Sequence, residues 1–133
     1  LDMNRNTVSD LMCYLEKAGI INQLRAETEG VRLLGKVDKV YLNNTNLVYV
    51  LSGNTPDIGN VRETFFFSTL RVVCPVTTSE VADFTVGGYT FEVGGKNKSQ
   101  KQVHDVENAY VVKDDIEYGM RNVIPFWVFV SLY

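Results

Sequence analysis

Two successive glycines, Gly87-Gly88, separate two short runs in which apolar and polar residues alternate. Alternation with a period of two is typical of β-strands, and a two-residue glycine turn is typical of a tight hairpin. The pattern predicts strands at Val81–Val86 and Tyr89–Val93. Because side chains alternate between the two faces of a strand, Asp83 and Glu92 are expected on one side, close together across the hairpin.

The segments around the hairpin predict a mixed α/β fold. Apolar residues at helical spacing follow Asp57, a candidate N-cap, and Glu63 falls in the middle turns of this helix. A β-like run at Pro75–Ser79 precedes the hairpin, and the continuously apolar run Asn108–Val112 is typical of a central strand. We also expect a short helix over 99–106, and a strand end followed by a short buried helix carrying Phe126, Trp127, Phe129 and Leu132.

The first half of the chain has the order of a partial winged helix. A helix is predicted at Thr7–Lys17, capped near Asn6 and ended by Gly19, and a short helix is predicted after Asn43 or Asn44. Between them lie β-like runs and a polar turn: Ile20–Ala26, the turn Glu27–Gly30, Val31–Leu34 and Val37–Leu42. The polar run Ser52–Asp57 is a linker, so we predict two regions, residues 1–53 and 54–133.

Composition limits the classes of protein that fit. With 133 residues and 45% hydrophobic content the chain can bury a core, and a net charge of -3 restricts any nucleic-acid contact to a local patch. Cys13 and Cys74 lie far apart with no metal-binding spacing, which indicates a reduced, cytoplasmic protein. The longest apolar stretch, Val123–Tyr133, is too short for a membrane span.

Two segments of the first half, TVSDLMCYLEKAGIINQL and KVYLNNTNLVYVLSG, resemble the winged-helix region of prokaryotic AAA-type P-loop ATPases. The segment ADFTVGGYTFEVGGKNKSQKQV resembles the C-terminal domain of the same family. The resemblance implies that an N-terminal ATPase domain of the same polypeptide is a partner and lies outside this chain, which begins without methionine. The run GGKNK lacks the Walker spacing, so we expect no nucleotide site here. The helix at Thr7–Lys17 matches a DNA-recognition helix, but its exposed face carries two acids against one base, which favours packing within the ATPase.

The order helix-Glu, strand-Asp, strand-Glu-x-Lys is also the pattern of the PD-(D/E)XK nuclease superfamily. By this resemblance Glu63, Asp83 and Glu92 match the acidic positions, which implies a Mg²⁺ site and a restriction-endonuclease-like mixed sheet flanked by helices. The lysine position holds Gly94, and Lys96 and Lys98 are the nearest candidates. We therefore expect the acids to converge with no ammonium group held beside them.

Three functions remain open at this point. The first is an interaction or regulatory module of an ATPase with a degenerate nuclease fold. The second is a Mg²⁺-dependent DNA nuclease that uses Lys96 or Lys98, and the third is a DNA-binding module without chemistry. The basic stretch Lys96, Lys98, Lys101 and Gln102 is either a phosphate-backbone contact or a solvated loop. His104 has no second ligand for zinc, so we expect it on the surface.

Overall fold

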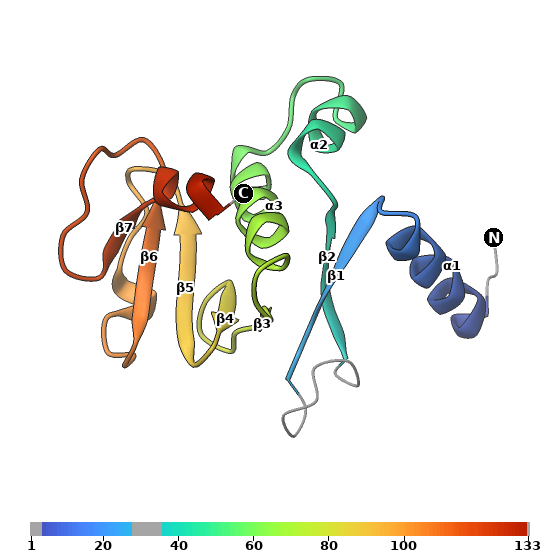
Figure 1. Cartoon of the computed structure of the whole chain (residues 1–133), viewed down its shortest axis with the longest axis horizontal. Helices are drawn as coiled ribbons and strands as arrows, with labels where there is room; N and C mark the ends of the chain where they lie inside the picture. Colours follow the sequence, from blue (N-terminus) through green and yellow to red (C-terminus); the bar gives the residue numbers. More distant parts are fainter. Residues whose placement is uncertain (1–3, 28–35, 133) are drawn as a thin grey trace.

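The computed structural model describes residues 4–27 and 36–132, and the strands in these ranges form a two-stranded and a five-stranded sheet. Along the chain, α1 (Arg5–Lys17), β1 (Ile21–Arg25), β2 (Val37–Leu42) and α2 (Thr45–Leu51) precede α3 (Ile58–Leu70). Figure 1 shows α3 between the β1–β2 hairpin and the larger sheet, with α1 at the far end of the molecule. None of the described helices has the length and apolar character to cross a bilayer.

The N-terminal elements follow the predicted order of helix, strand, strand and helix. Asn4 caps α1 by accepting from the backbone N–H of Asn6 at 3.2 Å, so the helix begins two residues earlier than expected. Gly19, with φ of 70°, follows its end. β1 and β2 pair antiparallel, with Ile21 opposite Leu42. Most of the predicted turn, residues 28–30, and the predicted strand Val31–Leu34 lie outside the described residues.

Two predicted caps fix the ends of the next helices. The Asn44 side chain accepts from the Leu47 N–H at 3.1 Å and starts α2. The Asp57 carboxylate accepts from the N–H groups of Gly59 and Asn60 at 2.7 and 3.4 Å and starts α3. Each side chain satisfies donors that the first helical turn leaves without an internal partner.

The larger sheet has the strand order β3-β4-β5-β6-β7. β3 (Thr77–Thr78), β4 (Phe84–Val86) and β5 (Tyr89–Gly94) run antiparallel, whereas β6 (Ala109–Lys113) and β7 (Val123–Pro125) run parallel to β5. Gly87 and Gly88 have φ of 55° and 85°, the left-handed region that a glycine enters without strain, and they form the predicted turn between β4 and β5.

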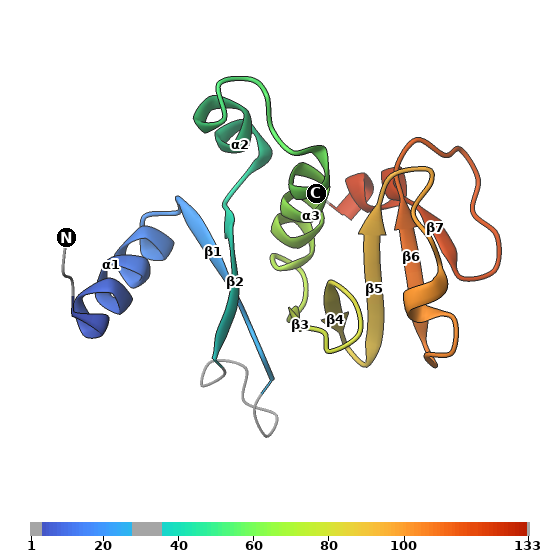
Figure 2. The same cartoon turned by 180° about the vertical axis from the view of Figure 1, so that it is seen from behind.

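Helical elements pack on both faces of this sheet. On one face, Phe66 of α3 packs against Phe84, Phe91 and Phe129, with ring centroids 5.2, 5.6 and 4.9 Å away. Phe129 belongs to η3 (Phe126–Leu132), the 3-10 segment that ends the described chain. The second cluster joins Val103 of η2 (Lys101–Val103) to Ala109 and Val111 of β6. Figure 2 shows η2 as the orange coil beside β6.

Two expectations about the C-terminal half are corrected. The helix predicted over 99–106 is reduced to η2, three residues of 3-10 helix. The expected buried terminal helix is a 3-10 segment in which Phe129 is buried, while Trp127 is 59% exposed and Leu132 is 42% exposed. One side of η3 packs against α3 and the sheet through Phe129, and its other side is exposed.

The β1–β2 hairpin shares a core with the larger sheet. Leu24 of β1 and Tyr41 of β2 are 0% and 4% exposed and belong to the same cluster as Phe67 and Phe84. The Tyr41 ring lies 5.4 Å from Phe67 and 5.9 Å from Phe84, centroid to centroid. The predicted boundary after residue 53 stays a prediction, but the hairpin before it packs directly on the region after it.

Candidate functional site

The three acids predicted as a metal site lie on neighbouring elements. Glu63 is on α3, Asp83 directly precedes β4, and Glu92 is in β5. The backbone N–H of Asp83 donates to the Phe91 carbonyl at 3.1 Å, and the Asp83 carboxylate accepts from the Val93 N–H at 2.9 Å. These two bonds hold Asp83 against the strand that carries Glu92, between Phe91 and Val93.

Glu92 is the buried member of the group. Its side chain is 2% exposed, and its Oε1 lies 2.5 Å from the ammonium nitrogen of Lys98. Its Oε2 is buried and has no hydrogen-bond partner among the described residues. Burial raises the pKa of Glu92, and the nearby carboxylates of Asp83 and Glu63 raise it further, although Lys98 opposes both effects.

Lys98 reaches Glu92 because the chain turns directly after β5. The backbone N–H of Lys98 donates to the Gly95 carbonyl at 2.9 Å, which closes a four-residue turn. Burial alone would lower the pKa of Lys98, but the contact with Glu92 and the attraction of Asp83 and Glu63 raise it overall. The amine therefore carries its proton at neutral pH.

Gly94 makes room for this lysine. A Cβ added at Gly94 would lie 2.6, 2.7 and 2.8 Å from Cδ, Cγ and Cβ of Lys98, closer than real Cβ contacts. The expectation that no ammonium group is held beside the acids is therefore wrong. The position where a lysine was expected holds Gly94, which has no side chain. The aliphatic stem of Lys98 fills the space that a side chain at Gly94 would occupy. Lys96, the other candidate, is exposed and forms no ion pair within the described residues.

The turn after β5 packs against a second group of charged residues, formed by Arg62 and two aspartates. The guanidinium of Arg62 lies against Gly95, where an added Cβ would be 3.2 Å from one of its nitrogens. Arg62 also donates to Asp114 at 2.9 Å and to Asp115 at 3.4 Å. Because the Asp114 N–H in turn donates to the Gly94 carbonyl at 2.9 Å, the turn is tied to both α3 and the end of β6.

Two residues of β2 complete the group, and sequence reasoning missed both. The Lys39 ammonium lies 3.7 Å from Oε2 of Glu63 and 3.5 Å from Oδ1 of Asp83. The Tyr41 hydroxyl donates to Oε2 of Glu63 at 2.7 Å. Burial and the Glu63 carboxylate raise the pKa of Tyr41, so the hydroxyl remains a donor. The available signal was the strand prediction itself, since Lys39 and Tyr41 are two residues apart and share a face of β2.

The acids supply the donor type that a hard divalent cation prefers, but in this structure they are paired with lysines. Carboxylate oxygens are the ligands that Mg²⁺ prefers, and Oε2 of Glu92 is a buried oxygen to which no group in residues 4–27 and 36–132 donates. Within residues 4–27 and 36–132, no three His, Cys, Asp or Glu side chains are arranged to hold a metal ion. Lys39 instead bridges Glu63 and Asp83, and Lys98 neutralises Glu92.

The basic stretch lies beside this group. Lys98, Ser99, Lys101 and Gln102 line a surface hollow of about 430 Å³. Lys101 and Gln102 are exposed, as is Lys96 on the preceding turn. These side chains are therefore accessible to a large ligand, and a phosphate contact there stays a prediction.

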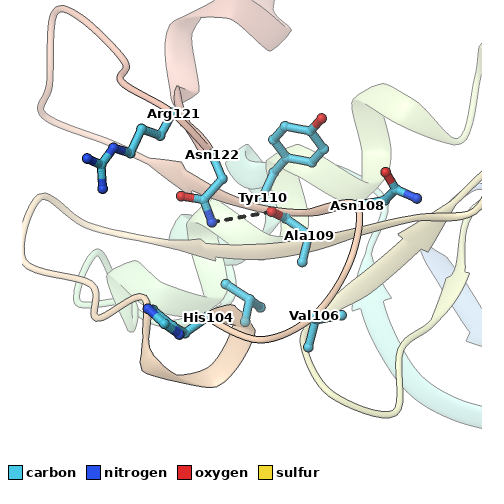
Figure 3. A pocket seen from close by; sticks show the side chains of 8 residues that line it. His104, Val106, Asn108, Ala109, Tyr110, Arg121 and Asn122 are labelled. Atoms are coloured by element: carbon cyan, nitrogen blue, oxygen red, sulfur yellow. Dashed lines mark hydrogen bonds between the residues drawn. The ribbon is translucent and has the colours of Figure 1, made fainter.

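A second hollow of about 410 Å³ lies at the start of the parallel strands β6 and β7. Figure 3 shows His104 on one wall and Arg121 and Asn122 on the other. The strand register places Ala109, which lines it, opposite Thr90, whereas Glu92 is opposite Val111 further along β5. His104 is exposed, as expected, and its Nδ1 lies 2.7 Å from the Asp105 carboxylate. No residue of this hollow belongs to the acidic group.

No family model, no curated protein and no solved structure matches the chain. The resemblance to the AAA-type ATPases and to the nuclease superfamily therefore stays a prediction from residues.

Proposed function

We propose that residues 54–133 form a divalent-metal-dependent DNA nuclease of the PD-(D/E)XK type, attached to an ATPase domain that lies outside this chain. One observation carries the proposal: the Lys98 ammonium lies 2.5 Å from a buried Glu92 whose second carboxylate oxygen has no partner in the described part of the chain. A degenerate site was expected because no lysine followed Glu92 at the usual spacing. The turn that brings Lys98 back over Gly94 removes that reason.

The order of the acidic residues supports the same proposal. Glu63 comes from a helix, Asp83 directly precedes β4, and Glu92 lies on β5. β3, β4 and β5 are antiparallel, and β6 returns parallel to β5 after a connection whose only regular element is the three-residue η2. A mixed sheet with helical elements on its faces is one feature that supports the proposal.

The residues divide into metal-holding and charge-stabilising groups. Glu63, Asp83 and Glu92 would hold Mg²⁺, which when bound supplies an activated water and neutralises charge on the scissile phosphate. Lys98 would act as a hydrogen-bond donor and as a positive charge near the developing oxyanion. The oxygen of water would bond to phosphorus as the bond from phosphorus to one deoxyribose oxygen breaks. One proton of the water would pass to solvent and the departing deoxyribose oxygen would take up a proton from solvent, so that the products are a phosphate monoester and a sugar hydroxyl. Lys96, Lys101 and Gln102 would contact the phosphate backbone beside the site.

A plasmid-nicking assay tests the proposal. The chain, incubated with supercoiled DNA and Mg²⁺ or Mn²⁺, should convert it to the relaxed form, and EDTA should stop the reaction. Asp83→Asn keeps an oxygen that can accept from the Val93 N–H but removes the negative charge, so nicking should fall by about 100-fold or more. Glu107→Gln is the matched control, because Glu107 is an exposed acid outside the group.

Intact plasmid in both metals, with a folded protein by circular dichroism, would end the nuclease proposal. Nicking that survives Asp83→Asn unchanged would point to a contaminating enzyme and would have the same consequence. Retarded migration of DNA without nicking would favour the DNA-binding module instead.

A second candidate is the interaction or regulatory module of the ATPase, and α1 is the observation in its favour. Val8, Leu11 and Leu15 are 41%, 45% and 37% exposed, and no residue of α1 is buried. An amphipathic helix normally covers its apolar face. If nicking is absent and Leu11→Glu abolishes binding of the ATPase domain in a pull-down, this second function replaces the first.

A further inference from the structure

Lys39 occupies a position that a bridging cation would take. Its nitrogen lies within 3.7 Å of Glu63 and 3.5 Å of Asp83, carboxylates from two separate elements of the chain. Like charges brought together in this way repel unless a cation lies between them. In this structure that cation belongs to β2, a strand outside the region to which the nuclease resemblance assigns the acids.

We propose that Lys39 is an internal competitor for the metal, and that a divalent cation binds Glu63 and Asp83 only by displacing its ammonium group. The inference rests on the proposed metal site. Because the same two carboxylates cannot be neutralised by the lysine and ligate the metal at once, the two states exclude each other. The β1–β2 hairpin thereby sets the metal concentration at which the site becomes loaded.

The contacts of β2 indicate that the side chain moves and the strand stays. On one side of Lys39, Asp38 accepts from the Thr78 hydroxyl at 2.7 Å. On the other, Tyr41 donates to Glu63 and packs its ring among Phe67 and Phe84. These anchors fix the strand in front of the acids, whereas the Lys39 side chain is 42% exposed. A flexible four-carbon stem can carry the charge into solvent without opening the hairpin.

The two lysines of the site differ in how tightly they are held, which identifies Lys39 as the exchangeable one. Lys98 lies 2.5 Å from a carboxylate that is 2% exposed, within hydrogen-bond distance. The nitrogen of Lys39 is 3.5 Å or more from carboxylates that are 14% and 25% exposed. Long, partly exposed ion pairs contribute little stability, so a divalent ion can replace Lys39 at the cost of weaker metal binding.

Calorimetric titration of Mn²⁺ into the chain without DNA tests the inference directly. Lys39→Gln should bind Mn²⁺ about tenfold more tightly than wild type, because the competitor is gone. Lys39→Arg keeps a positive charge and should remain close to wild type. Lys36→Gln is the matched control: it removes the same charge from an exposed position before β2, where the described residues form no ion pair with it.

The outcomes separate this inference from the proposed function. Equal Mn²⁺ affinity of wild type and Lys39→Gln, or weaker binding by the variant, would overturn the competition and leave the metal site intact. If Lys36→Gln increases the Mn²⁺ affinity as much as Lys39→Gln does, the increase comes from the lower net charge of the protein. That result would also overturn the proposed competition by Lys39. If neither protein binds Mn²⁺ while both unfold cooperatively on heating, the metal site and the competition fail together.

Discussion

The turn after β5 and the strand β2 each supply one lysine to the same acids, and they do so by different physical means. Lys98 is brought back by a turn of four residues over a glycine, so its place is set by local chain geometry. Lys39 arrives from a hairpin that is held by Tyr41 in the core and by Asp38 on Thr78. Its place depends on packing between segments that are distant in sequence.

This difference supports assigning Lys98 to the proposed chemistry and Lys39 to the proposed control of metal binding. Lys98 makes a short contact with a buried carboxylate, and removing it would leave a charge that burial penalises. Lys39 makes long contacts with partly exposed carboxylates and can leave them. If the two lysines differ in this way, variants at Lys98 should lower the catalytic rate, whereas variants at Lys39 should alter metal binding.

The largest expected effect is that of Lys98→Ala. Under the proposed function, loss of the charge that Lys98 places beside Glu92 should lower kcat for plasmid nicking by about 100-fold or more. Calorimetry should still detect Mn²⁺ binding, because Glu63, Asp83 and Glu92 remain. Lys96→Ala on the same turn is the control, and its kcat should stay near wild type because that side chain is exposed.

A rescue variant makes the first prediction sharper. Gly94→Lys combined with Lys98→Ala places an amine two residues after Glu92, where the nuclease superfamily has it, and leaves the space of the Lys98 stem for its own stem. Part of the lost kcat should return. A double variant that folds but stays as inactive as Lys98→Ala would contradict the idea that Lys98 substitutes for a lysine at that position.

A smaller effect is expected from Gly94→Ala. The new methyl group would lie 2.6 to 2.8 Å from the Lys98 side chain, including its Cβ, so the stem of the lysine has to shift. Misplacement of the ammonium group should lower kcat on the order of tenfold, with KM little changed. Gly95→Ala should cost less, because its methyl group meets Arg62 at 3.2 Å and the guanidinium can adjust. Equal kcat values for wild type and Gly94→Ala would break the link between the glycine and the lysine.

Local signals in the sequence predicted much of the fold. The Gly87-Gly88 turn, the caps at Asn44 and Asp57 and the buried strand β6 all depend on residues adjacent to one another, and all lie where expected. The C-terminal segment was less predictable, because an apolar residue such as Trp127 is buried only if another element covers it.

The candidate site was only half predictable for the same reason. The pairing of Asp83 with the strand of Glu92 follows from strand alternation, which acts between neighbours. The contact of Lys98 with Glu92 depends on the conformation of the turn after β5. The residue types of that four-residue turn do not determine this conformation. The arrival of Lys39 and Tyr41 depends on the hairpin packing against α3, a long-range contact that a single sequence does not encode in any local pattern.

The smallest expected effect concerns Tyr41, the anchor beside Lys39. Tyr41→Phe keeps the ring in the core but removes the hydrogen bond to Glu63, so the free energy of unfolding should fall by about 1.5 kcal/mol. Urea denaturation measures this, and Tyr118→Phe, at a residue 80% exposed, should show no change. Because the pKa of Tyr41 is raised in the folded state, the difference should be constant up to about pH 9. It should shrink above about pH 10, where tyrosine ionises in the unfolded chain but not in the fold. A loss that does not depend on pH in this range would mean that the hydroxyl is not what anchors β2 beside the acids.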